Sequence, residues 1–575
     1  MTLSRRDLIR SGFVVGGAIA LGGRPASAWA LDPIPANPAG TTLAQTFVKG
    51  PAGPGGYRPV VTALGEAYGM RNDLGLTLPT PPPPASRTSL LAFAQITDVH
   101  IIDAQSPARV EYVDRFEDQF GPSDPTLNLL ESSYRPQEIL TTQVADSMAR
   151  KINSIAVAAP ATGRPLDFAI QTGDNADNAQ LNETRWNIDV LDGGKVLTPD
   201  SGANTTAYEG VTDRKHYDPH YWHPEPGPAN KQDLYHTEFG FPDVAGLIAA
   251  AIRPFLAEGL DIPWYSVFGN HDGLVQGNFP RTIPLDAVAR GSLKITGVPP
   301  GLSQADVIKA FNTQDASILL GSAALKSANH VHRDGQRRVL SRKQIVAEHF
   351  KTTGTPVGHG FTATNKLKGT AYYTFDHGSN VRCIVLDTCN PNGYAEGSID
   401  GPQFNWLKQQ LATSTDKFVL VFSHHTIATM TNGLRGTGGD FKIRVRGPAV
   451  KAELLKYPNV VAWVNGHTHR NTITAHKTAS GTGGFWEINT ASHVDFPQQS
   501  RTIELVDNGN GTLSIFTTML DHNGPASNGG DLGDTVALSA LARELSANDP
   551  QERESGKNGA LNDRNVELLV ANALV

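Results

Sequence analysis

Apolar runs that end in clusters of polar side chains constrain the fold of this chain more than any other feature. Six stretches read as strands, and most are continuously apolar, which indicates burial on both faces. They are "SLLAFAQIT", "LDFAIQT", "IPWYSVF", "VRCIVLD", "KFVLVFS" and "NVVAWVN". Helical patterns lie between them, for example at residues 137–158 and 403–412. We therefore expect an α/β protein whose helices cover the sheets.

Five of these runs are followed by residue types that bind metals. The clusters are Asp98 and His100; Asp174, Asn175, Asp177 and Asn178; Asn270, His271 and Asp272; His424 and His425; and His467 and His469. Because residues beyond the carboxyl ends of neighbouring parallel strands gather at one edge of a sheet, clusters far apart in sequence are expected to meet in space. Carboxylates, imidazoles and a carboxamide suit Zn, Fe or Mn, and the lack of thiolates argues against a structural zinc site.

The spacing within the clusters supports a shared site. Asp98 and His100 are two residues apart, as are His467 and His469, so in an extended segment the members of each pair point the same way. A glycine stands at the start of the "GD", "GN" and "GH" clusters, where it is expected to let the backbone turn sharply. Asn175 and Asn178 have a simpler role open to them, because asparagine often shapes such turns through bonds to the backbone.

The ordered series D-x-H, G-D-x-x-D, G-N-H-D, a histidine after a strand and G-H-x-H resembles the signature of the calcineurin-like metallophosphoesterases. The resemblance extends over roughly residues 90–510 and includes a "Q-x-x-W-L" helix at residues 403–407. It implies a β-sandwich of two mixed sheets flanked by helices, with a dinuclear metal site at the carboxyl-terminal ends of the strands. Asp177 stands where purple acid phosphatases place an iron-binding tyrosine, so a purple Fe(III) centre is not expected.

The resemblance also implies a role for each matching residue. One metal is expected on Asp98, His100, Asp174 and His469, and a second on Asp174, Asn270, His424 and His467. His271 is expected to act as general acid or electrostatic stabiliser, oriented by Asp272. His424 is preferred over His425 as ligand because the family's ligand usually comes first in such a pair. His425, Asn175 and Arg470 are candidates for substrate binding. Arg109 and Arg501 also lie near motifs, but each of the three arginines, taken singly, is better explained as a solvated or ion-paired side chain.

These roles predict hydrolysis of a phosphate ester by in-line attack of a metal-bound water, with two Mn, Fe or Zn ions as cofactors. Phosphodiesters are the favoured substrates, and a phosphomonoesterase is the first alternative. A catalytically silent binding protein on the same fold is the second, although no motif residue is missing. A nuclease is disfavoured, because a net charge of -7 gives no basic surface for nucleic acid.

The first 30 residues have the layout of an export signal. Arg5 and Arg6 precede a short, glycine-rich apolar run and two A-x-A cleavage candidates, and "SRRDLI" resembles a twin-arginine signal. The run is too short to span a bilayer comfortably, so no stable membrane span is expected in the mature form. We expect export by the twin-arginine machinery to the periplasm, the cell wall or the medium, where the substrate is a small or polymeric phosphate ester.

The remaining segments are assigned by composition. Residues 31–88 are rich in proline and glycine, end in "LPTPPPPASR" and are predicted to form a spacer or surface strap. The catalytic domain is placed at residues 89–524, with insertions near 183–240 and 280–365 and a hairpin at 502–520. Residues 525–575 are predicted to form a loop and two short helices, the last of which opens with the N-cap-like "NDRNVELL" at residues 562–569. The two cysteines, Cys383 and Cys389, lie on and just after one strand and are expected to be free and mostly buried.

Overall fold

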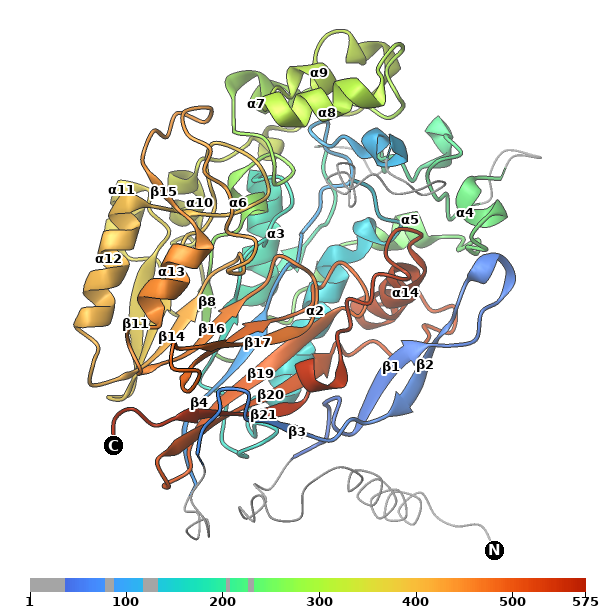
Figure 1. Cartoon of the computed structure of the whole chain (residues 1–575). Helices are drawn as coiled ribbons and strands as arrows, with labels where there is room; N and C mark the ends of the chain where they lie inside the picture. Colours follow the sequence, from blue (N-terminus) through green and yellow to red (C-terminus); the bar gives the residue numbers. More distant parts are fainter. Residues whose placement is uncertain (1–36, 78–86, 117–132, 203–206, 226–231) are drawn as a thin grey trace, which may run out of the picture.

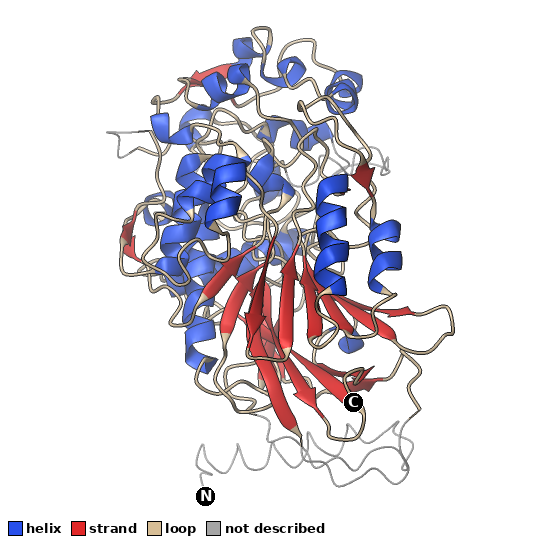
Figure 2. Ribbon diagram, turned by 90° about the vertical axis from the view of Figure 1, so that its left-hand side faces the viewer, coloured by secondary structure: helices blue, strands red, loops and turns tan. Residues whose placement is uncertain are grey.

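The computed structural model describes residues 37–77, 87–116, 133–202, 207–225 and 232–575 (Figure 1). Two sheets lie at its centre, and helices cover them on either side (Figure 2). The predicted export signal at residues 1–30 and the proline-rich tract at residues 78–86 fall outside the described residues. The predicted α/β architecture of two mixed sheets flanked by helices is confirmed.

A seven-stranded sheet forms one layer of the sandwich. Its strands, in spatial order, are β3 (Gly69–Arg71), β21 (Val566–Ala571), β20 (Thr512–Asp521), β19 (Gln499–Asp507), β4 (Thr88–Ile96), β5 (Phe168–Gln171) and β8 (Trp264–Ser266). The last three run parallel to one another, so their carboxyl ends lie along the same edge. Strands β19 and β20 form the predicted hairpin.

A six-stranded sheet forms the other layer. Its order is β11 (Tyr373–His377), β12 (Val381–Val385), β14 (Phe418–Phe422), β16 (Val460–Asn465), β18 (Gly484–Asn489) and β17 (Thr472–Lys477). The four central strands are parallel, and the two edge strands are antiparallel to their neighbours. Between the two sheets, the ring of Phe93 on β4 meets that of Phe422 on β14 at 5.6 Å. The strands are apolar on both faces because one face meets the other sheet and the second face meets helices.

The covering helices confirm the predicted helical segments. Helices α2 (Thr141–Ile155) and α3 (Leu181–Asp192) pack on the outer face of the seven-stranded sheet. Helices α12 (Gly401–Ala412) and α13 (Gly447–Leu454) pack on the outer face of the six-stranded sheet. Helix α14 (Thr535–Asn548) packs against α2.

Short elements occupy the long connections between the strands. Between β5 and β8 these are β6 (Val196–Leu197), α4 (Leu234–Thr237), α5 (Leu247–Ala251) and β7 (Phe255–Leu256). After β8 come α6 (Asn270–Gly273), α7 (Ile283–Ala289), β9 (Leu293–Ile295), α8 (Gln304–Thr313), α9 (Ser317–Leu320), β10 (Ala328–His330), α10 (Arg342–Glu348) and α11 (Ala363–Lys368). The two-stranded pair β13 (Ile399–Asp400) and β15 (Arg444–Val445) flanks α12. Helices α7 to α9 form the top of the molecule in Figure 1.

Both terminal segments are more ordered than their composition indicates. The N-terminal segment forms the hairpin β1 (Gln45–Lys49) and β2 (Val60–Leu64) and contributes β3 to the large sheet. The prediction of two helices after residue 525 is right for α14 and wrong for residues 566–571, which form β21 between β20 and β3. A short apolar run is compatible with either a helix or a strand, and here its pairing with the edge of β20 makes it a strand.

Two smaller predictions also have an outcome. Cys383 and Cys389 are both free and buried, as expected, and burial raises the pKa of Cys389 to about 12. Among the described residues, the helices are either too short or too polar to cross a membrane.

Candidate metal centre

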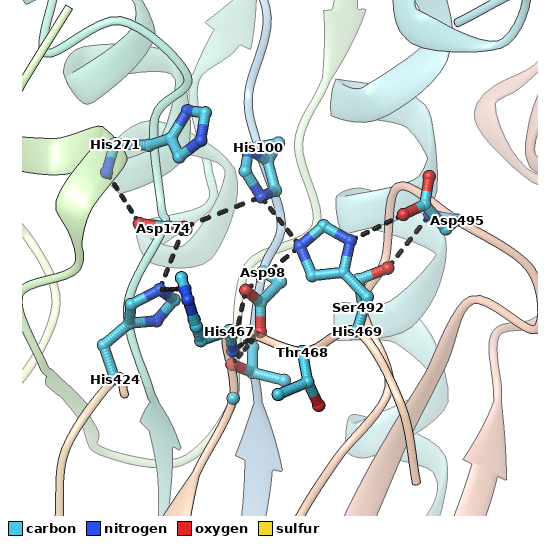
Figure 3. A network of polar contacts seen from close by, with 12 residues as sticks. Asp98, His100, Asp174, His271, His424, His467, Thr468, His469, Ser492 and Asp495 are labelled. Carbon is cyan, nitrogen blue, oxygen red and sulfur yellow. Dashed lines mark hydrogen bonds and ion pairs between the residues drawn. The ribbon is translucent and has the colours of Figure 1, made fainter. Parts of the chain in front are cut away.

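Five strands deliver the predicted ligand residues to one place between the two sheets. Asp98 and His100 follow β4, Asp174 follows β5, Asn270 follows β8, His424 follows β14, and His467 and His469 follow β16. The first three strands belong to the large sheet and the other two to the small sheet, so the site spans both layers. Several of these side chains surround a common centre in Figure 3, where Asp174 lies between His100 and His424.

The backbone at these positions is left-handed, which differs from the extended conformation expected for the D-x-H and H-x-H pairs. The φ angles are 48° at Asp98, 45° at His100, 50° at Asp174, 73° at His467 and 54° at His469. Positive φ is uncommon in residues other than glycine and clusters at functional sites, where the surrounding structure holds it in place. Here the loops hold each other, since Asp98 N donates to Gly173 O at 3.1 Å and His100 N to Asp174 O at 2.9 Å.

The three glycines of the clusters serve two different purposes. Only Gly173 adopts a positive φ, of 96°, as the expected sharp turn requires. At Gly269 a Cβ atom would lie 2.2 Å from Asp174 Oδ1, and at Gly466 it would lie 2.0 Å from Thr97 Oγ1. At these two positions glycine therefore allows two segments of the site to approach closely, instead of allowing a turn.

The Nε2 atoms of His100 and His469 face each other, and neither carries a proton when its ring is neutral. His100 donates from Nδ1 to Asp177 Oδ1 at 3.0 Å, and His469 donates from Nδ1 to Asp495 Oδ2 at 2.6 Å. Each Nε2 then carries a lone pair, and the two Nε2 atoms are 3.2 Å apart. Asp98 Oδ1 lies 3.3 Å from His469 Nε2. Two lone pairs and a carboxylate oxygen directed at one point fit a bound cation.

A second group of the same kind adjoins the first. His424 donates from Nδ1 to Thr172 O at 3.0 Å, so its Nε2 carries the lone pair, and this atom lies 3.2 Å from His467 Nδ1. Asp174 Oδ2 is 2.9 Å from His424 Nε2 and 3.8 Å from His100 Nε2, which places this carboxylate between the two groups.

Asn270 completes the second group. Its amide nitrogen donates to Gly277 O at 3.2 Å, whereas its buried Oδ1 has no hydrogen-bond partner among the described residues. A buried carbonyl oxygen without a partner is costly, and a cation would satisfy it. The seven predicted ligands therefore fit two metal ions that share Asp174.

His271 and Asp272 occupy the same loop but have different surroundings. His271 lines the cavity over the site, and its Nδ1 donates to the backbone oxygen of Asp177 at 2.8 Å. Burial lowers the pKa of His271, but the charges of Asp174 and Asp177 outweigh it and raise the pKa to about 9. The ring nitrogen that is left, Nε2, is the one available to a substrate.

Asp272 does not orient His271, contrary to the sequence-based expectation. Its carboxylate accepts from the backbone nitrogens of Gly269 at 2.8 Å, Asn175 at 3.1 Å and Ala176 at 3.2 Å. It thereby ties the loop after β8 to the loop after β5. The carboxylate beside the His271 ring is that of Asp177, 3.4 Å from Nδ1, and Asp177 also orients His100. The backbone nitrogen of His271 donates to Asp174 Oδ1 at 2.8 Å.

None of the three candidate substrate residues lines the cavity, although the ring of His425 packs against those of His424 and His467. His425 is buried and bonded to Thr388 and Ala395, and Asn175 donates its amide to Asp272 at 3.1 Å. Arg470 donates to the backbone oxygens of Ser555 and Gly556. Arg109 is buried and ion-paired with Asp177, Glu111 and Glu138, as the simpler explanation expects. Arg501 is also buried, but it is neither solvated nor paired with a carboxylate among the described residues, since it donates to backbone and neutral side-chain oxygens.

A cavity of about 270 Å³ opens over the proposed ligands. Its wall includes residues that the sequence analysis missed, namely Arg135, Gln276, Phe279, Phe311 and Lys557. Asp495, which orients His469, was also missed. The signal for Asp495 was present, because "INTASHVDF" is one more polar cluster after a strand, β18. Arg135 and Lys557 lie in no motif.

The fold and the donor set define a metallophosphoesterase, a hydrolase of phosphate esters. Residues 233–471 match the family model described as calcineurin-like phosphoesterase. Over this segment the chain is similar to the calcineurin-like phosphoesterases. The matched residues contain the G-N-H-D and G-H-x-H clusters and the histidine after β14, while the D-x-H and G-D-x-x-D clusters precede them and complete the same site.

Two solved structures are similar to the chain only at a low level. A dimetal phosphatase from Danio rerio is 10% identical, with a TM-score of 0.33 over 76% of this chain and 100% of that one. GAP50, the anchor in the inner membrane complex of Plasmodium, is 10% identical, with a TM-score of 0.24 over 78% of this chain and 87% of that one. Neither likeness adds to the assignment. No curated protein matches the chain.

Proposed function

We propose that this protein is an exported phosphoesterase that uses two metal ions, Mn, Fe or Zn, and prefers phosphodiesters. The observation that carries the dinuclear site is the pairing of imidazole lone pairs. His100 and His469 form one pair and His424 and His467 the other, each with ring nitrogens 3.2 Å apart. Without a cation, the facing lone pairs of His100 and His469 repel each other, and the carboxylate of Asp174, which lies between the two pairs, would be shared by two bound cations.

Bound ions would supply an activated water and would neutralise charge on the phosphate oxygens. The chain itself supplies the other functions. His271 faces the cavity, and its Nδ1 is bonded to a backbone oxygen, so Nε2 is the atom that donates a proton to the leaving oxygen. Asp177 fixes the rings of both His100 and His271, and Asp272 holds together the two loops that carry them.

The preference for phosphodiesters is the sequence-based expectation, and a phosphomonoesterase is the first alternative. Arg135 and Lys557 line the cavity beside the ligands. Both are ion-paired with Asp495, which offsets their charge, so these two side chains do not favour the extra negative charge of a monoester. A silent binding protein is the remaining alternative, which the complete set of ligands and the accessible His271 disfavour.

The decisive experiment compares an aryl phosphate monoester with its diester, using mature protein loaded with Mn²⁺. His271→Ala and Asn270→Ala are measured beside the wild type. Diester hydrolysis that falls in both variants supports the proposal, whereas hydrolysis of the monoester alone makes the protein a phosphatase. If neither ester is cleaved with Mn, Fe or Zn although the ions bind, the binding-protein alternative replaces the proposed activity.

Export through the twin-arginine machinery is a separate part of the proposal. It is supported by "SRRDLI" and the A-x-A sites within the first 30 residues. We propose a location in the periplasm, in the cell wall or outside the cell, where nutrient, lipid-headgroup or wall-polymer phosphates are available. Replacing Arg5 and Arg6 by lysine in the full chain should retain the protein in the cytoplasm. Unchanged export of this variant, measured by fractionation, would refute the twin-arginine route.

A further inference from the structure

The metal-binding orientation of His469 depends on a carboxylate that lies outside the family's motifs. Asp495 Oδ2 accepts from His469 Nδ1 at 2.6 Å, on the opposite side of the ring from Nε2 (Figure 3). The backbone nitrogen of Asp495 donates to Ser492 Oγ at 3.0 Å, which fixes the turn after β18. Such partners set the tautomer and direction of a ligand histidine, and their loss weakens metal binding.

Two cations from distant parts of the chain hold Asp495. Arg135 Nε is 2.7 Å from Asp495 Oδ1, and Lys557 Nζ is 2.8 Å from Asp495 Oδ2. All three side chains are buried or nearly so, with side-chain exposures of 3%, 0% and 13% for Arg135, Asp495 and Lys557. Lys557 also pairs with Glu552. A buried carboxylate needs such partners, because an unpaired charge in the interior is strongly unfavourable.

The segment that carries Lys557 is attached directly beside the G-H-x-H motif. It connects α14 to β21, and residues 555–559 lie along residues 470–471. Asn471 N donates to Lys557 O at 3.0 Å, and Arg470 donates to Ser555 O at 2.6 Å and to Gly556 O at 3.0 Å. The contact is close, since a Cβ on Gly559 would lie 2.1 Å from Asn471 O.

We propose that residues 555–559 act as a clasp that completes the metal centre, with Lys557 as a positioning residue that acts through Asp495 on His469. The inference rests on the proposed dinuclear site. Its effect is confined to one ion, because the second group of ligands has other supports: His424 is oriented by Thr172 O and Asn270 by Gly277 O. The family match ends at residue 471, so the clasp lies beyond it.

The experiment measures binding of Co²⁺ alone to the metal-free full chain, by competition with a chelator and by the visible absorption of the bound ion. Lys557→Met keeps the length of the side chain and removes the charge, and Lys557→Arg restores the charge. We expect Lys557→Met to weaken one of two Co²⁺ sites by about 10-fold, at the lower end of the effect of losing such a partner. The other site should keep its affinity, and Lys557→Arg should recover most of the loss.

Two further variants separate positioning from a general structural effect. Arg553 lies in the same connection between α14 and β21, donates to Gly55 O and does not line the cavity. Arg553→Met should therefore leave both Co²⁺ affinities unchanged. In the Asp495→Asn background, Lys557→Met should have almost no further effect, because Lys557 acts through this carboxylate. Equal weakening of both sites, no weakening, or additive losses in the double variant would each overturn the proposal. Two intact Co²⁺ sites without ester hydrolysis would instead contradict the proposed activity.

Discussion

Gly277 is the position where a single methyl group should disable the proposed general acid without replacing a ligand. It lies in the loop after α6, outside any helix or strand, and has a φ of 64°. A Cβ atom at this position would lie 2.3 Å from His271 Cδ2 and Nε2, and 2.6 Å from Asn270 Nδ2. Gly277→Ala therefore presses on the catalytic ring and on the amide of a ligand at the same time.

The size of the effect follows from these distances. His271 must withdraw by roughly 1 Å to restore an ordinary contact, and a misplacement of that size can cost about 10²-fold in rate. Alanine in the left-handed region also costs about 1–2 kcal/mol of stability. Gly163→Ala is the matched control, because Gly163 has a similar φ of 70° but open space around its Cβ position. The control should lose stability and keep its activity.

The assay compares kcat for an aryl and an alkyl phosphate ester in the Mn²⁺-loaded enzyme, with thermal melting of each variant. An alkyl leaving group needs a proton more than an aryl group does, so Gly277→Ala should slow the alkyl ester more. If Gly277→Ala melts like Gly163→Ala and hydrolyses both esters at the wild-type rate, His271 is not the acid, and the reasoning fails. An equal loss for both esters would point to Asn270 and its metal instead.

Three other predictions rest on burial and charge. Asn270→Ala removes one ligand oxygen of the second metal group and should bring the metal content from two ions toward one per chain, as elemental analysis would show; two tightly held ions would contradict the assignment. Cys383 and Cys389 are buried, so native protein should resist alkylation at neutral pH and react only when unfolded, as mass spectrometry can test; rapid modification of the native form would show that these thiols are accessible. Burial raises the pKa of Asp114 to about 7, so the folded protein keeps a proton that the unfolded chain releases, and stability should fall between about pH 4 and pH 7. Asp114→Asn should reduce this fall by on the order of a few kcal/mol in denaturant titrations at pH 5 and pH 8, and parallel pH profiles would refute the prediction.

The sequence determined the layers and the ligands because both depend on local patterns. A continuously apolar run specifies a strand buried on both faces, and the residues that follow it stand at the strand end whatever the rest of the chain does. Asp98, Asp174, Asn270 and the later histidines could therefore be assigned to one site before any contact was known. The hairpin at residues 502–520 follows from the same kind of local signal.

Only the tertiary structure decided which groups support those ligands and form the wall of the cavity. Asp177, and not Asp272, meets His271, because the loops after β5 and β8 cross in a way that residue spacing does not specify. Residues 566–571 became a strand because β20 has an edge to pair with. Lys557 reaches Asp495 across 62 residues of sequence, and contacts of this kind depend on how segments dock, which no local pattern encodes.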